Sequence, residues 1–254
     1  MPAPLFISHG APDVLLLDTP AHQALRGLGS GKPPAAYVIV SAHWQSGGVT
    51  ITAGNQLATI HDFRGFGATL DLFDYPVAGA PGLAVEIQNL LAQSGIEAGL
   101  DFKRGLDHGA WIPMALIRPE ADIPVIQISL PRQTDNASFK LGRALASLSE
   151  KNIQLIGSGA ITHSLADSLT MPENAVPATF AEIFLNALTP ALEAGDLQAV
   201  RSWRSLPEAE RNHPTPEHIR PLFFALGASY DQRGKRLHTS WSRSALAMDI
   251  WAFD

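Results

Sequence analysis

The chain has 254 residues, of which 46% are hydrophobic and 17% are charged, so it holds enough apolar sequence for the core of one large α/β domain. Its formal net charge of −6 offers no basic surface, and we therefore expect neither nucleic acid nor an anionic membrane as a partner. The absence of cysteine excludes disulfides and thiolate metal sites, which leaves His, Asp and Glu as ligands for a transition metal.

The N-terminal segment carries no targeting signal that we can identify. Residues 1–7 lack a basic segment followed by an apolar stretch and a cleavage site. No apolar run in the chain approaches the roughly 18 residues that a membrane-spanning helix requires. We therefore expect a cytoplasmic protein.

The first predicted elements are a short strand and a helix. Residues 5–8 are apolar and end at His9, where Gly and Pro residues indicate a turn. A helix is predicted from Pro20 to about Gly27, because Thr19 is a good N-cap and proline is favoured at the first helical position.

A buried strand and a long loop follow. The apolar, β-branched run at residues 36–42 is typical of a central parallel strand that is buried on both faces, and it ends at His43. Residues 49–52 predict a further strand. Residues 55–81, which include His61, lose regular periodicity but contain several aromatic side chains, so we interpret them as an ordered lid or pocket wall.

The rest of the chain alternates between helical and strand patterns. Helices are predicted at residues 82–93, 112–117, 136–150, 177–194, 197–203 and 219–226, and strands at residues 123–130, 153–156, 236–242 and 246–251. The last two strands would form an antiparallel edge pair. We find no repeat or linker, so the alternation predicts an α/β fold over residues 1–254. It would be a single domain with a mostly parallel central sheet and helices on both faces.

Histidines follow three of the predicted strands. His9 and His43 come directly after strands, and His163 follows residues 153–156 through a glycine-rich turn. Because parallel strands end at one edge of the sheet, where open α/β folds bind ligands, these side chains should meet there. His218, in the first turn of a predicted helix, is a fourth candidate. A single histidine is more often a packing or surface residue, but several at one edge favour a zinc or non-haem iron site.

Six short segments follow one another along the chain: Ser8–Pro12, Val40–Trp44, Ile60–Phe63, Asp107–Trp111, Gly157–His163 and Pro214–His218 with Pro221 and Leu222. In these segments and in their order, the sequence resembles the DODA-type, LigB-like class III extradiol aromatic ring-opening dioxygenases. The resemblance covers most of the chain. It implies one α/β catalytic domain with a mononuclear metal in a cleft at the C-terminal edge of the strands.

The resemblance also implies roles for individual residues. His9, His43 and His218 would be metal ligands, and His163 would be a catalytic acid and base or a fourth ligand when zinc is bound. A related branch of the family uses two His and one Glu, which makes Glu217 the alternative third ligand. Fe(2+) is the metal expected for activity, and Zn(2+) would bind at the same site.

The implied reaction is opening of a catechol-type, DOPA-like ring by O2. It needs a group that removes and returns protons; His163 is the first candidate, His108 the second, and His61 would hydrogen-bond substrate. His61 and His108 also have a purely structural interpretation, in which each forms a hydrogen bond with the aspartate next to it in the sequence, Asp62 and Asp107 respectively.

Two features of the protein stay open at this stage. No basic cluster marks a pocket for a substrate carboxylate. The candidates are Arg64, Lys103, Arg104 and Arg220, and surface charge is the better explanation for them. The protein would be a monomer or a homodimer.

Two other functions are compatible with the same histidines. A zinc hydrolase would activate water on the metal, and a non-enzymatic relative would keep the fold and the pocket without the reaction. We favour the dioxygenase because His61 and His108 accompany the ligand set, and a plain zinc site does not require them.

Overall fold

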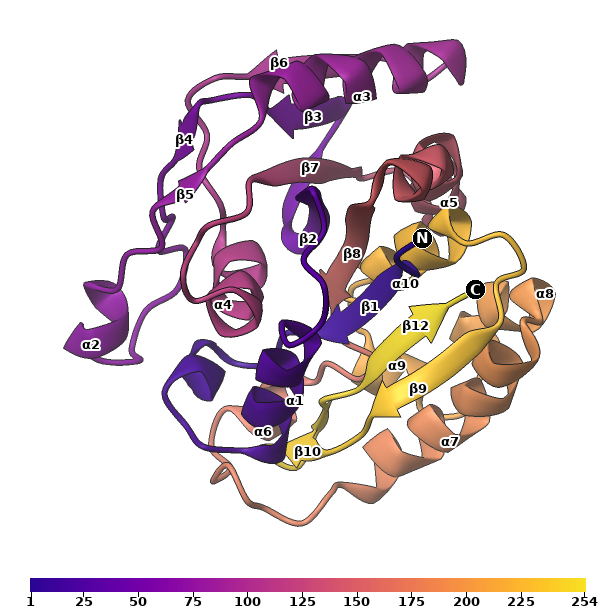
Figure 1. The fold of residues 1–254 in the computed structure, drawn as a ribbon. Coiled ribbons are helices and arrows are strands. Elements are labelled where there is room, and N and C mark those ends of the chain that lie inside the picture. The colour runs from indigo at the N-terminus through magenta and orange to yellow at the C-terminus, as the bar shows by residue number, and fades with distance from the viewer.

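An eight-stranded sheet in the order β6-β3-β7-β2-β8-β1-β12-β9 forms the centre of the molecule in a computed structural model that describes residues 1–254 (Figure 1). Its strands are β1 (Leu5–Ser8), β2 (Ala36–Ser46), β3 (Val49–Thr52), β6 (Ala98–Asp101), β7 (Val125–Pro131), β8 (Ile153–Gly159), β9 (Gly234–His238) and β12 (Ile250–Phe253). Strands β7, β2, β8 and β1 are parallel, whereas β12 and β9 continue the sheet in antiparallel fashion. The predicted mostly parallel α/β fold is confirmed.

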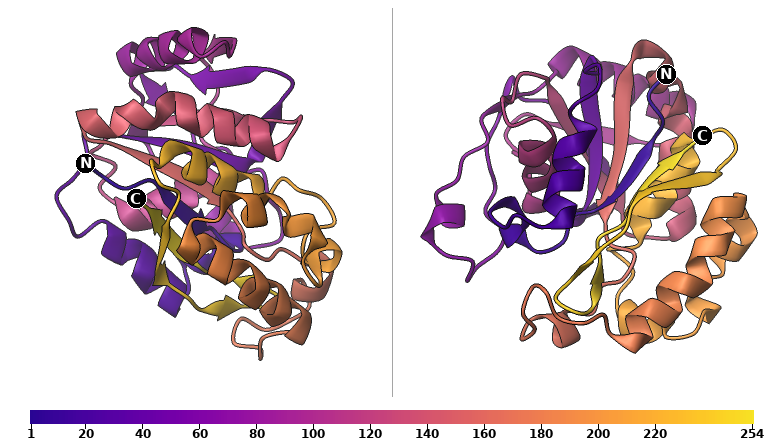
Figure 2. Two further views of the ribbon diagram at one scale, coloured as in Figure 1. Left: turned by 90° about the vertical axis from the view of Figure 1, so that its right-hand side faces the viewer. Right: turned by 60° about the horizontal axis from the view of Figure 1, so that its bottom comes forward.

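Helices cover both faces of this sheet. On one face lie α1 (Pro20–Leu28) and α4 (His108–Ile117); on the other lie α3 (Pro81–Gln93), α5 (Asp135–Leu145), α7 (Thr179–Ala194) and α10 (Arg220–Ala228). The remaining helices are short: α2 (Ala68–Asp71), α6 (Leu165–Ser168), α8 (Leu197–Arg201), α9 (Ala209–Asn212), η1 (Pro12–Leu15), η2 (Ala146–Lys151) and η3 (Trp203–Ser205). Figure 2 shows the orange C-terminal helices beside the yellow strands. None of the helices combines the length and apolar content needed to cross a bilayer.

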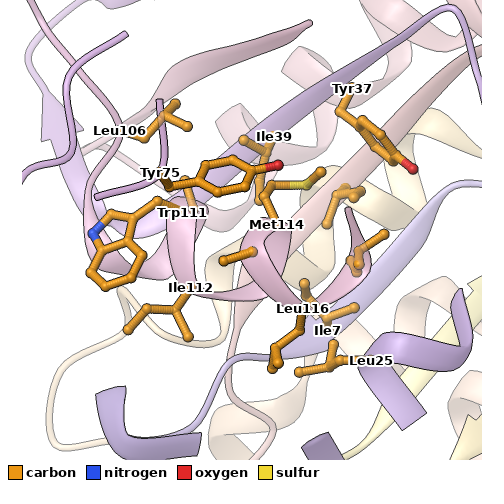
Figure 3. Close-up of a cluster of buried hydrophobic side chains, with 14 of the residues drawn as sticks. Ile7, Leu25, Tyr37, Ile39, Tyr75, Leu106, Trp111, Ile112, Met114 and Leu116 are labelled. Atoms are coloured by element: carbon orange, nitrogen blue, oxygen red, sulfur yellow. The ribbon is translucent and has the colours of Figure 1, made fainter. Parts of the chain in front are cut away.

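The alternation of side chains along β2 explains why helices pack on both of its faces. Tyr37 and Ile39 point into an apolar cluster with Trp111 of α4, part of which is drawn in Figure 3. Val38 and Val40 point into a second cluster, which includes residues of α5 and α10. Because successive strand residues face opposite sides, an uninterrupted apolar run is stable only between two helical layers.

Several boundaries differ from the sequence-based expectation. Strand β2 does not end before His43 but continues to Ser46, past a register irregularity. The segment 55–81 contains two short strands, β4 (Gln56–Leu57) and β5 (Val77–Ala78), together with α2. Strand β6 was not predicted, because an edge strand of sequence Ala-Gly-Leu-Asp has no apolar alternation. The closing strands pair as predicted, with β12 beside β9, and a small hairpin of β10 (Trp241–Ser242) and β11 (Leu246–Ala247) lies between them in the chain.

Candidate active site

The side chains of the site reach one face of the sheet through the alternation of the strands. His9 continues the series of Leu5 and Ile7, which face α4, and Ser158 follows Ile156 by the same alternation in β8. Helix α4 begins directly above them at His108. The fit is close: a Cβ at Gly109 would lie 2.3 Å from Ser41 Oγ, 2.9 Å from His43 Cδ2 and 3.3 Å from His9 Cε1. Only glycine lets the first turn of α4 approach the strand ends in this way.

Five histidines line a single cavity of about 260 Å³ at this edge of the sheet. They are His9, His43, His108, His163 and His218. Ring centroids are 5.0 Å apart for His9 and His43, 3.9 Å for His43 and His108, and 5.6 Å for His9 and His218. The remaining wall is mostly apolar and includes Phe63, Phe66, Leu165, Leu169 and Leu246. Four of the predicted strand-end and helix-start histidines therefore do converge, together with His108.

A hydrogen-bond chain fixes the tautomer of His9. The Ser158 hydroxyl donates its only hydrogen to the carbonyl of Gly109, so its oxygen must accept from His9 Nδ1, 2.9 Å away. His9 therefore carries its proton on Nδ1 and a lone pair on Nε2. That Nε2 lies 3.1 Å from Nε2 of His43, which places the two ligand atoms around a common point.

His218 has a free ring nitrogen as well. Its Nδ1 donates to Glu217 Oε1 at 3.2 Å, and its Nε2 is buried without a hydrogen-bond partner. Leaving a buried polar atom unpaired costs roughly 1–3 kcal/mol, so a ligand bound at this atom would be stabilising. His163 stacks on His218 with centroids 3.4 Å apart and planes inclined by 10°. Glu217 lies behind His218 and does not line the cavity.

Backbone packing holds His218 in place. Strand β8 carries Gly157 and Gly159 on the side that meets α10, and a Cβ at Gly159 would lie 2.2 Å from the His218 carbonyl oxygen. The same carbonyl accepts from the amide of Ala160 at 2.8 Å. His218 therefore lies two residues before α10 begins at Arg220, rather than within its first turn as expected.

His108 is oriented by a carboxylate that is distant in sequence. Asp62 Oδ1 accepts from His108 Nδ1 at 2.8 Å and from the backbone amide of His108 at 3.0 Å. The buried Asp107 instead pairs with Gln127. The proposed pairs of neighbours, Asp62 with His61 and Asp107 with His108, are thus wrong, because the loop path brings Asp62 to the start of α4.

His61 lies outside the cavity. Its Nε2 donates to the carbonyl of Phe73 at 2.9 Å, its ring packs beside Trp111, and its side chain is exposed. Five of the six histidines proposed for the site therefore line one cavity, and His61 lies in the surrounding loop instead.

Burial keeps the clustered imidazoles neutral. It lowers the pKa of His43 to about 3, with a further contribution from the charge of His108, and it lowers the pKa of His163 to about 4. Burial, followed by the charges of neighbouring histidines, also holds the pKa of His9 and of His218 well below the usual value. At neutral pH these rings therefore offer lone pairs, which is the form that binds metal.

Asp62, unlike these histidines, is held in its charged form. Burial raises the pKa of its carboxyl, but the hydrogen bond and the charge of His108 outweigh that effect and bring the pKa to about 2. An ionised Asp62 therefore faces His108 at neutral pH, so that Nδ1 of His108 is protonated and its Nε2 points to the cavity.

The donor set fits a transition metal. Ligand atoms of His9, His43 and His108 all lie within 4.8 Å of one another, and the unpartnered Nε2 of His218 supplies a further donor. Neutral imidazoles suit zinc and Fe(II). Two sets of three ligands are therefore possible. His9 and His43 belong to both, and the third ligand is either His218 or His108.

Three features of the candidate site were missed by sequence analysis. They involve Ser158, Asp62 as the partner of His108, and Arg243, which is the only Arg or Lys in the cavity wall. Ser158 lies within a family motif, and its alternation with Ile156 is a signal that could have identified it. No local signal points to Arg243.

Comparison with known proteins agrees with the geometry. The family model "Catalytic LigB subunit of aromatic ring-opening dioxygenase" matches residues 6–252. A 4,5-DOPA dioxygenase extradiol of Beta vulgaris is 38% identical over 98% of this chain and 95% of its own length. The protein of that name from Escherichia coli strain K12 is 36% identical over 90% of this chain and 85% of its own length. The crystal structure of an uncharacterized Escherichia coli K12 protein superposes with a TM-score of 0.83 at 27% identity, covering 100% of both chains.

Proposed function

The chain belongs to the family of the catalytic LigB subunit of aromatic ring-opening dioxygenases, and from this premise we propose that it opens a catechol-type, DOPA-like ring with O2. The family and the named relatives support an extradiol dioxygenase-type function. The observation that carries the finer proposal is the cavity itself, in which several neutral imidazoles with free nitrogens face an apolar wall. Residues 1–254 would form one catalytic domain.

We assign the metal to His9, His43 and His218. The first two have facing Nε2 atoms 3.1 Å apart, and the third has the buried, unpartnered Nε2. Glu217 would act behind His218 by accepting from its Nδ1, which keeps Nε2 free. When bound, Fe(2+) would supply the site at which a catecholate and O2 react; Zn(2+) would occupy the same ligands without that redox chemistry.

The remaining two histidines would handle protons. His163 lies against His218 in the cavity wall, and burial keeps its ring neutral. We assign to its free ring nitrogen the transfer of a catechol proton. His108, with its Nδ1–H directed to Asp62, presents Nε2 to the same cavity and is the second candidate. The apolar wall formed by Phe63, Phe66 and Leu165 would hold the ring and exclude water.

The proposal is tested by reconstituting the protein with Fe(2+) without oxygen and then adding O2 and a panel of catechols. We expect O2 uptake in equal amount to substrate and a yellow, semialdehyde-type product. Full metal loading without O2 uptake on any catechol would contradict the proposal. Ester or amide hydrolysis by the zinc form alone would instead indicate the hydrolase.

The His43→Ala variant tests the metal site. It removes one of the two facing Nε2 atoms, so we expect the purified protein to lose most of its bound metal. His238→Ala is the matched control, because His238 bonds only to Ser240, outside the cavity. Elemental analysis of both proteins measures the effect, and an unchanged metal content in His43→Ala would refute this assignment.

A further inference from the structure

Arg243 is the only Arg or Lys among the residues that line the cavity. It lies in the turn between β10 and β11, where Arg243 and Ser244 adopt left-handed backbone angles, with φ of 49° and 65°. Such angles are uncommon for residues other than glycine and cost free energy. The turn is anchored by two backbone bonds, from Arg243 to the carbonyl of Glu173 at 3.1 Å and from Ala178 to the carbonyl of Ser244 at 2.8 Å.

Two carboxylates flank the guanidinium of Arg243. Asp13 accepts a hydrogen bond from its Nη2, and Glu173 Oε2 lies 3.8 Å from its Nε, which is buried and has no hydrogen-bond partner. Asp13 follows Ala11 and Pro12, which themselves line the cavity. Glu173 also accepts from the Ser242 hydroxyl at 2.7 Å. One cation and two anions thus form a mixed-charge cluster beside a largely apolar cavity.

This cluster matches the charges of an α-amino-acid group. A carboxylate requires a cation, and Arg243 lines the cavity with a planar fork that suits bidentate pairing. Its Nη2 donates to Asp13, and its Nη1 makes only a long contact of 3.5 Å with the carbonyl of Met171. An ammonium requires nearby anions, which Asp13 and Glu173 provide. Apart from the histidines and Ser168, the rest of the wall is apolar, and Arg243 is its only Arg or Lys.

We propose that Arg243 and Asp13 are the specificity-determining residues of this cavity, and that they bind the carboxylate and the ammonium of a zwitterionic substituent on the aromatic ring. The inference rests on the proposed function, since it concerns the substrate of that reaction. The catechol hydroxyls would lie at the metal site, and the mixed-charge cluster would select among catechols by their substituents.

The experiment compares kcat/KM for L-DOPA with that for 4-methylcatechol, which has the ring but no charged group. In the Arg243→Met variant we expect the ratio of the two values to fall at least tenfold, through a higher KM for L-DOPA. Arg118→Met is the matched control: Arg118 pairs with Asp122 at 2.6 Å, and neither residue lines the cavity or adjoins a residue that does, so its ratio should stay within twofold of wild type.

A second variant separates the two charges. Asp13→Asn should reduce the preference for L-DOPA over 3-(3,4-dihydroxyphenyl)propanoate, which keeps the carboxylate but lacks the ammonium. If Arg243→Met does not fold, as judged by its melting temperature, Arg243→Lys replaces it, because it keeps the charge and loses the fork; a partial fall in the ratio is then expected.

The outcomes distinguish this inference from the proposed function. If kcat/KM falls equally for both substrates in the Arg243 variant, or if the ratio of the two values does not change, the inference is overturned. The cluster would then only connect the loops that carry it. A wild-type protein, fully loaded with Fe(2+), that consumes no catechol of the panel would instead refute the proposed function. Anaerobic titration of the zinc form with L-DOPA gives a binding readout that is independent of turnover, and Arg243→Met should weaken that binding at least tenfold.

Discussion

At the scale of single residues, the proton on His9 is controlled by a side chain that cannot itself bind the metal. The Ser158 hydroxyl donates to Gly109 and accepts from His9 Nδ1, so Nε2 of His9 is left free. Partners of this kind fix the ring orientation and the tautomer of a ligating histidine before the metal arrives.

Replacing Ser158 should therefore weaken metal binding without removing a ligand. In Ser158→Ala, the Nδ1–H of His9 loses its acceptor, and we expect the affinity for Zn(2+) to fall by about 10–100-fold. Competition with a chelator measures the affinity. Ser138→Ala is the matched control, since Ser138 is buried and its hydroxyl has no partner. Equal affinities in the two variants would contradict this role for Ser158.

Asp62 offers a test of the role of His108. Asp62→Asn removes the ionised acceptor that orients the His108 ring. If His108 handles protons, kcat should fall roughly tenfold or more while metal content stays at the wild-type level. Asp62→Glu, which keeps the carboxylate, should recover part of the loss. A parallel loss of metal in Asp62→Asn would instead place His108 among the ligands, as its distance to His9 and His43 permits.

At the scale of elements, the site depends on close contact between β8 and the segment that leads into α10. Gly157 and Gly159 lie against the backbone of Pro221 and His218, with no room for a side chain. Gly109 likewise leaves room at the start of α4, where a Cβ would meet the side chains of Ser41 and His43. The face proposed to bind metal therefore depends on close approaches at glycines, which ordinary hydrophobic patterns do not encode.

The Gly159→Ala variant should damage both stability and the site. Its Cβ would lie 2.2 Å from the His218 carbonyl oxygen, so the backbone must shift, at a cost of about 1–3 kcal/mol. We expect a lower melting temperature and weaker metal binding together. Gly27→Ala is the control, because a Cβ there meets nothing within 4 Å and alanine is the better helix former. Wild-type metal affinity in Gly159→Ala would show that His218 is not held by this contact.

At the scale of the whole molecule, several histidines are buried in their neutral form. His213 belongs to this group although it lies outside the cavity: its Nε2 donates to the carbonyl of Ile161 at 2.7 Å, and burial lowers its pKa to about 4. The folded protein therefore binds fewer protons than the unfolded chain at mildly acidic pH, and acid favours unfolding.

The free energy of unfolding of the metal-free protein should accordingly decrease as the pH is lowered. The contribution of His213 is fully present above pH 6.5, the pKa expected in the unfolded chain, and is lost as the pH falls through 4. This group alone accounts for roughly 3 kcal/mol between those limits. Urea unfolding at a series of pH values measures the effect, and His213→Gln should show a shallower dependence. Equal slopes for the two proteins would refute the assignment.

The sequence by itself determined the fold class and the approximate place of the site. Apolar runs such as residues 36–42 and the helical spacing of residues 82–93 depend on near neighbours in the chain, so periodicity was sufficient to predict a mostly parallel sheet with helices on both faces. Histidines that follow parallel strands must reach one edge, which is why His9, His43 and His163 were grouped correctly in one cavity.

Only the tertiary structure decided which side chains act on these histidines. His108 pairs with Asp62 across 46 residues, His9 with Ser158 across 149, and Arg243 with Asp13 across 230. Such pairs depend on the paths of loops and on the contact of glycine-bearing backbones, and no local pattern records them. Alternation along a strand therefore predicts the face of the sheet that a histidine reaches, whereas the packing of distant segments fixes its proton, its orientation and the charge beside it.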